Sequence, residues 1–160
     1  MYGQNLIIAN ATGCSSIYGA SFPSTPYTKT DEGYGPAWAN SLFEDNAEFG
    51  FGMKIAYETM RDRIQNILIA HLDEMPETLQ SLAESWLEHR DDLSETKAIH
   101  QKIIPILESI NTPYARELLS IKDYFIKASQ WIVGGDGWAY DIGYGGIDHV
   151  IANNCVFYYF

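Results

Sequence analysis

The amino-acid sequence predicts an α/β fold, and three observations lead to this prediction. An apolar, strand-like run, Leu6–Ala9, stands near the start of the chain. A long block with apolar residues at three- and four-residue spacing follows, which is the pattern of amphipathic helices. A second apolar run, Trp131–Val133, stops at a glycine-rich turn, and helix-like spacing then continues to Val150. This order of elements is typical of a parallel sheet flanked by helices.

The first 41 residues show little helical periodicity. Apart from Leu6–Ala9 they are rich in glycine, serine, threonine and proline, with Pro23, Pro26 and Pro36 along the stretch. We therefore predict one strand followed by a long irregular segment, and such segments commonly serve a functional site or an interface. At the other end, the aromatic run Val156–Phe160 predicts a further strand that is cut short.

Residues 45–128 predict a block of helices, of which about 53–128 form a helical insertion in the domain. Four stretches carry the apolar stripe, and prolines stand at the start of two of them, where a helix tolerates proline. The predicted helices cover residues 53–71, 76–87, 94–110 and 113–128. Pro105, inside the third, predicts a kink or a break because it lacks an amide hydrogen.

Charge and cysteine content exclude several classes of protein. The chain has 21 acidic and 10 basic residues, and its net charge of −11 disfavours binding to nucleic acid phosphates. Two cysteines, Cys14 and Cys155, do not suggest a disulfide framework. No run approaches the roughly 18–20 apolar residues of a membrane span, and the first residues lack the basic region of a secretory signal. We expect no nucleic-acid partner, no membrane and a cytoplasmic location.

The glycine turn Gly134–Gly137 contains Asp136, between a predicted strand and a predicted helix. Glycines let the backbone approach an anion closely, and a helix N-terminus supplies free N–H groups. A carboxylate there would repel a bare phosphate, but it suits a site in which Mg²⁺ joins the carboxylate to a diphosphate. A Gly-Asp-Gly tripeptide is commonly only a turn, so these residues alone leave both interpretations open.

Two rival sites have weaker support. Glu44, Asp45 and Glu48 form an acidic group, but only two of them share a helix face, so we interpret the group as a solvated helix start. The four histidines show no metal-ligand spacing, and we interpret His149 as a packed, hydrogen-bonded side chain.

Three stretches resemble, in the same order, the pyruvate:ferredoxin (flavodoxin) oxidoreductase family. They are IANATGCSSIYG at 8–19, GPAWANSLFEDNAEFG at 35–50 and GGDGWAYDIGYGGIDHV at 134–150. The last resembles the thiamine-diphosphate signature of that family. The resemblance implies that residues 1–160 are a partial thiamine-diphosphate-binding domain, an α/β parallel sheet flanked by helices with the helical insertion, from the C-terminal part of such an enzyme.

The resemblance also implies site residues. Asp136 would bind Mg²⁺, and Gly135, Gly137 and Trp138 would line the diphosphate of the cofactor. Cys14 would ligate the 4Fe–4S cluster beside the thiazolium ring, whereas Cys155 matches no ligand of the family. The ligand sets are incomplete in this chain, because the family's other cluster cysteines and second pair of Mg²⁺ ligands have no counterpart here.

The implied activity is oxidative decarboxylation of pyruvate to acetyl-CoA, with electron transfer through iron–sulfur clusters. The implied partners are the rest of the oxidoreductase polypeptide or its subunits, ferredoxin or flavodoxin, and pyruvate and coenzyme A in the full enzyme. The alternative is a non-catalytic chain, either a truncated remnant or a split-gene piece that acts only in assembly with other chains. We assign no catalytic residue and expect the isolated chain to be inactive.

Overall fold

The computed structural model describes residues 3–19, 31 and 33–153, which fall into two compact units. Unit 1 comprises residues 1–55 and 128–160, and unit 2 comprises residues 56–127. The predicted strand Val156–Phe160, most of the proline-rich stretch and Cys155 lie outside the described residues.

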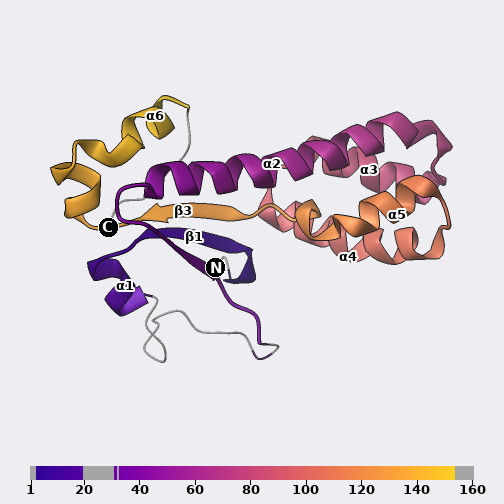
Figure 1. Cartoon of the computed structure of the whole chain (residues 1–160). Helices are drawn as coiled ribbons and strands as arrows, with labels where there is room; N and C mark the ends of the chain where they lie inside the picture. The colour runs from indigo at the N-terminus through magenta and orange to yellow at the C-terminus, as the bar shows by residue number, and fades with distance from the viewer. Residues whose placement is uncertain (1–2, 20–30, 32, 154–160) are drawn as a thin grey trace. The chain divides into compact units, whose positions relative to one another are not determined.

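Unit 1 is built on a three-stranded parallel sheet in the order β2–β1–β3 (Figure 1). Asn10 of the central strand lies opposite Asn40 on one side and Val133 on the other. The elements of this unit are β1 (Leu6–Ala11), α1 (Cys14–Gly19), β2 (Ala37–Ser41), the start of α2 (Asn46–His71), β3 (Ser129–Val133) and α6 (Ile147–Ala152). The predicted α/β fold with a parallel sheet is confirmed.

The two predicted strands are confirmed as β1 and β3, but β2 and α1 were not predicted. The β2 sequence, Ala-Trp-Ala-Asn-Ser, has small and polar residues and lacks a clear alternating pattern. It forms a strand because it pairs with β1, so tertiary context overrides a weak local preference. The six residues of α1 are too few to show a helical period.

Between β3 and α6 the chain forms a series of tight turns in place of the regular helical pattern read from the sequence. A π-helical turn spans Gly137–Asp141, and a 3₁₀ turn spans Tyr144–Gly146. Gly143, Gly145 and Gly146 have positive φ, which glycine tolerates readily, so a regular helix begins only at Ile147.

Helix α2 packs closely on the sheet through Gly50. A Cβ atom there would lie 2.5 Å from Cγ1 of Ile132 and 3.2 Å from Cβ of Ala9. Ala47, one turn earlier, is fully buried. The small residues at these positions let the helix backbone lie directly over β1 and β3.

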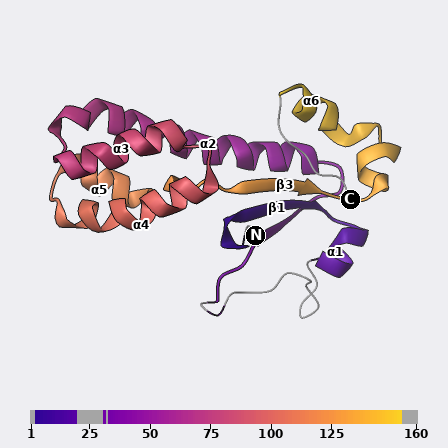
Figure 2. The ribbon, with the colours of Figure 1, turned by 180° about the vertical axis from the view of Figure 1, so that it is seen from behind.

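Unit 2 is helical (Figure 2), and its buried apolar side chains form one core cluster. It contains the later part of α2, α3 (Glu77–His89), α4 (Leu93–Ser109) and α5 (Pro113–Ser120). The first three predicted helices are confirmed, although α2 starts earlier than expected, at Asn46. No helix in the described part of the chain is long and apolar enough to cross a membrane.

The predicted end of the fourth helix and a predicted break at Pro105 are wrong. The fourth helix does not reach Ala128, because α5 ends at Ser120 and a 3₁₀ turn, Lys122–Phe125, follows. Pro105 does not break α4, which continues through it, so of the two predicted effects the break is wrong and the kink stays a prediction. Both Pro105 and Gln101, whose carbonyl loses its amide partner, are exposed. The missing hydrogen bond therefore lies on the solvent side of the helix.

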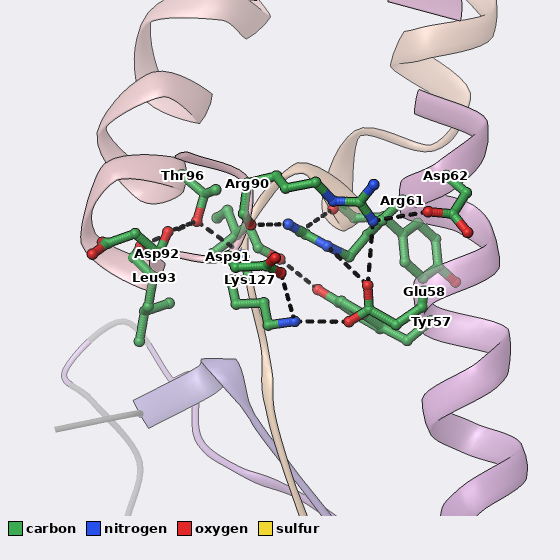
Figure 3. Close-up of polar contacts among 12 residues, drawn as sticks. Tyr57, Glu58, Arg61, Asp62, Arg90, Asp91, Asp92, Leu93, Thr96 and Lys127 are labelled. Carbon is green, nitrogen blue, oxygen red and sulfur yellow. Dashed lines mark hydrogen bonds and ion pairs between the residues drawn. The ribbon is translucent and has the colours of Figure 1, made fainter. Parts of the chain in front are cut away.

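Charged side chains join the start of unit 2 to its end (Figure 3). Arg61 is fully buried and donates hydrogen bonds to the carbonyl oxygens of Tyr124 (2.9 Å) and Arg90. Glu58 accepts a hydrogen bond from Nζ of Lys127 (2.8 Å). These hydrogen bonds link the first part of unit 2 to its last residues, in addition to the contacts of the apolar core.

Candidate functional site

The two stretches expected to hold cofactors lie at one edge of the sheet. β1 and β3 are parallel neighbours, so their carboxyl ends meet at the same edge. Cys14 begins α1 shortly after β1, and Asp136 stands shortly after β3. We call this the carboxyl edge. Ligands of open α/β sheets bind outside the carboxyl ends of the strands.

Phe43, which follows β2, lies against both turns. Its ring is 3.2 Å from the position that a Cβ on Gly137 would take, and 4.0 Å from the corresponding position on Gly13. The side chain is 38% exposed, so part of the ring faces outward at the carboxyl edge. Residues from all three strand ends therefore meet at this edge.

Asp136 is exposed and immediately precedes the π-helical turn. Among the described residues its carboxylate caps no backbone amide of that turn. Gly135, beside it, has no described atom within 4 Å of the place where a Cβ would stand. An exposed carboxylate next to an open stretch of backbone can approach a cation and the diphosphate that the cation carries.

Trp138 is almost fully buried, at 2% exposure. Its indole lies between two glycines, because a Cβ on Gly134 would be 2.5 Å from Cε3 and one on Gly145 would be 2.8 Å from Nε1. The Nε1 atom is buried without an acceptor among the described residues. The indole thus packs in the core of unit 1 and holds the Asp136 turn from one side; that Trp138 lines a diphosphate stays a prediction.

A buried asparagine holds the turn that leads into α1. Asn10 is fully buried, and its Nδ2 donates to Oγ of Ser16 (3.1 Å) and Oδ1 of Asn40 (2.9 Å). Its Oδ1 accepts from Oγ of Ser15 (2.5 Å). The amide of Gly13 also donates to Oγ of Ser16 (3.2 Å). This turn is therefore anchored to β1 and β2.

A second buried asparagine, Asn46, touches all three strands. Its Nδ2 donates to the carbonyl oxygens of Val133 (3.0 Å) and Ala9 (3.5 Å), and its Oδ1 accepts from Oγ of Ser41 (2.9 Å). The side chain is 0% exposed. The sequence analysis assigns Asn46 no role, although the residue lies in the resembling stretch 35–50. The available signal is an amide next to an apolar residue, Ala47, at the start of α2.

The described residues supply only part of a metal site. Among them, no three His, Cys, Asp or Glu side chains lie close enough together to hold a metal ion. One carboxylate oxygen of Asp45 is buried without a hydrogen-bond partner in the described part of the chain. Asp136 can serve as one Mg²⁺ ligand beside phosphate oxygens. Cys14 is the one cysteine in the described residues, whereas a 4Fe–4S cluster takes four protein ligands.

Similarity to curated proteins extends along nearly the whole chain, although no protein-family model matches it. The chain is 48% identical over 164 residues to the pyruvate-flavodoxin oxidoreductase of Klebsiella pneumoniae. It is 46% identical over 161 residues to the pyruvate:ferredoxin oxidoreductase of Moorella thermoacetica, and 40% over 190 residues to the pyruvate dehydrogenase [NADP(+)] of Cryptosporidium parvum. The matches cover 95–96% of this chain, but only 13%, 14% and 10% of the respective relatives.

Proposed function

We propose that this chain, which belongs to the pyruvate:ferredoxin (flavodoxin) oxidoreductase family, is the segment that contributes one side of the thiamine-diphosphate site of such an enzyme. It spans about 13% of the length of its curated relatives. The observation that carries the proposal is the meeting of two distant stretches, those of Cys14 and Asp136, at the carboxyl edge.

In this proposal Asp136 is a ligand of Mg²⁺, and the metal neutralises the diphosphate that the carboxylate would otherwise repel. Gly135 lets the backbone approach the diphosphate, because no described side chain fills the space beside it. Gly137 and Trp138 hold the turn through their contacts with Phe43 and Gly134. When bound, thiamine diphosphate supplies the electron sink for decarboxylation of a 2-oxo acid.

Cys14 supplies one thiolate to a 4Fe–4S cluster beside the cofactor, and the other ligands come from outside this chain. The Asn10 network stabilises the turn that carries Cys14. In a longer polypeptide or an assembly, the site would serve oxidative decarboxylation of pyruvate with coenzyme A. Electrons would pass through iron–sulfur clusters to ferredoxin or flavodoxin. The isolated chain is expected to be inactive because each ligand set is incomplete.

We place the working assembly in the cytoplasm, where thiols stay reduced and available to a cluster. The relatives' names mention flavodoxin, ferredoxin and NADP(+). The choice of acceptor is therefore assigned to the part of the enzyme outside this segment.

A segment exchange tests the proposal. This chain replaces the matching segment of the Klebsiella pneumoniae relative, and thiamine-diphosphate affinity in Mg²⁺ is measured by calorimetry, with iron content and cluster spectra measured in parallel. Asp136→Ala should weaken cofactor binding about 100-fold or more, because it removes a metal ligand, and should leave the iron content unchanged. Cys14→Ser should lower the iron content and leave cofactor affinity unchanged.

Each variant serves as the control of the other. An exposed carboxylate of the same turn, Asp141, provides a further control, since Asp141→Ala should change neither readout. If Asp136→Ala and Asp141→Ala bound the cofactor with equal affinity, Asp136 would not be a metal ligand. If Cys14→Ser kept its full iron content, Cys14 would not be a ligand of the 4Fe–4S cluster.

A further inference from the structure

We infer that Asn46 is a positioning residue for Asp136: it anchors the end of β3 and thereby holds the Asp136 turn at the carboxyl edge. Its effect on the cofactor rests on the proposed function, whereas its effect on the turn does not. Asn46 touches no predicted cofactor ligand, so it acts through the backbone that carries Asp136.

The hydrogen bonds of Asn46 converge where the turn begins. Val133 is the last residue of β3, and its carbonyl accepts from Nδ2 of Asn46 at 3.0 Å. The same nitrogen lies 3.5 Å from the carbonyl oxygen of Ala9 in the central strand. Ser41, at the end of β2, donates to Oδ1 of Asn46 at 2.9 Å. One side chain therefore joins the last residue of β3 to Ala9 inside β1 and to Ser41, the last residue of β2.

The turn after Val133 needs such an anchor. It starts with Gly134 and Gly135, and glycine backbones lose more conformational freedom on ordering than those of other residues. Trp138 packs over Gly134 and restrains the far side of the turn. Asn46 restrains the near side, so the backbone that carries Asp136 is restrained on both sides.

Only an amide meets both requirements at this position. Nδ2 faces carbonyl oxygens and must donate, while Oδ1 faces a hydroxyl and accepts. A carboxylate of the same shape would place an oxygen against the carbonyls of Val133 and Ala9 inside a fully buried site. Asn46→Asp is therefore a nearly isosteric change. It replaces the hydrogen bonds to the carbonyl oxygens of Val133 and Ala9 by repulsive contacts between oxygens.

The first measurement uses the chain itself. Hydrogen exchange of the peptide that covers residues 134–141 should become about tenfold faster in Asn46→Asp, because the end of β3 loses its anchor. Asn46→Ser, which adds no charge, provides a milder second variant in case the first does not fold. Ile64→Val provides the control for general destabilisation, since Ile64 is fully buried in the core of unit 2. It should leave exchange in the 134–141 peptide unchanged.

The second measurement uses the segment exchange described above. At a temperature where all variants are folded, Asn46→Asp or Asn46→Ser should raise the dissociation constant for thiamine diphosphate and Mg²⁺ about tenfold, as substitutions that support a metal ligand do. Ile64→Val should leave the dissociation constant unchanged. A purely structural role for Asn46 would make the two Asn46 variants unfold at a lower temperature without changing the affinity of the folded molecules.

The two measurements separate the two proposals. Exchange at 134–141 that is no faster in the Asn46 variants than in Ile64→Val would overturn the positioning role. An unchanged dissociation constant in the Asn46 variants, with normal binding by the unsubstituted exchange protein, would overturn it as well. If the unsubstituted exchange protein bound no thiamine diphosphate, the proposed function would fail, and the exchange rates would still decide the role of Asn46.

Discussion

At the scale of single residues, Arg61 is a buried charge whose bonds are mostly to backbone. Its guanidinium donates to the carbonyl oxygens of Tyr124 and Phe125, and it lies 5.3 Å from the ring centre of Trp86. Nε, which is buried, is 3.7 Å from the carboxylate of Glu58 and has no hydrogen-bond acceptor among the described residues. Burial lowers the pKa of Arg61, although the charge of Glu58 opposes this effect.

Removing this guanidinium should destabilise the protein strongly. Arg61→Met removes the side-chain donor from the carbonyl oxygens of Tyr124 and Arg90 and removes one of the cations near Glu58, so we expect a loss of about 3–5 kcal/mol in the free energy of unfolding. Arg63→Met is the matched control: Arg63 pairs with Glu117 at 2.7 Å, but both side chains are about half exposed, and its loss should cost less than about 1 kcal/mol. Urea unfolding followed by circular dichroism measures both, and equal losses would contradict the role of Arg61.

The polar residues differ in how far their sequence surroundings predicted their role. Cys14 and Asp136 stand in motifs whose letters resemble a known family, so both could be singled out in advance. Asn10 and Asn46 also stand in resembling stretches, but neither their residue type nor that of Arg61 indicates a metal or cofactor ligand. Their importance depends on burial and on distant hydrogen-bond partners, which no local pattern encodes.

At the scale of elements, the contact between α2 and the sheet depends on one glycine. The position of a Cβ on Gly50 is occupied by Ile132 from β3 and is close to Ala9 from β1. Gly52, on the same helix, has no described atom within 4 Å of its Cβ position. The two glycines therefore differ in packing while sharing the same helix and the same low helix propensity.

This difference predicts opposite effects for two identical changes. Gly50→Ala should lower the free energy of unfolding by about 1–3 kcal/mol, because the methyl group has no room against Ile132. Gly52→Ala should raise it by up to about 1 kcal/mol, since alanine favours the helix and meets open space. Thermal unfolding of both variants tests the pair, and stabilisation by Gly50→Ala would show that α2 does not pack here as described.

Elements with a strong internal period were predictable, and those made by contact were not. Apolar residues at three- and four-residue spacing predicted three helices of unit 2. Short continuous apolar runs predicted the strands β1 and β3. By contrast, β2 is a strand only through its pairing with β1, and the helix expected to reach Ala128 ends at Ser120. After that point Phe125 turns into the core and contacts Trp86. An apolar stripe read along the sequence does not distinguish such a turn from a further helical turn.

At the scale of the whole molecule, unit 1 carries few basic residues for the diphosphate site that we propose in it. In the sequence of residues 1–55 and 128–160 there are eight acidic residues and two basic ones, Lys29 and Lys54. A diphosphate brought to this unit would find almost no lysine or arginine to neutralise it. A divalent cation must therefore provide most of the attraction.

Cofactor binding by the segment-exchange protein should accordingly depend on a divalent metal. Chelation with EDTA should lower the affinity for thiamine diphosphate by about 100-fold or more, and added Mg²⁺ should restore it. The control is the same titration with KCl in place of MgCl₂ at equal ionic strength, which screens charge without bridging the carboxylate and the diphosphate. Equal affinity in KCl and MgCl₂ would contradict a bridging role for the metal.

The sequence by itself determined that the chain forms an α/β fold with a helical block and that it is acidic. It also singled out Asp136 and Cys14 as the candidate ligands of Mg²⁺ and of the cluster. These conclusions depend on patterns a few residues long, namely apolar spacing, turn chemistry and motif letters. Only the tertiary structure decided that Asn46 is buried against all three strands, bonded to Val133 at a separation of 87 positions. Burial and hydrogen-bond partners arise from contacts between distant segments, and those contacts exist only once the chain has folded.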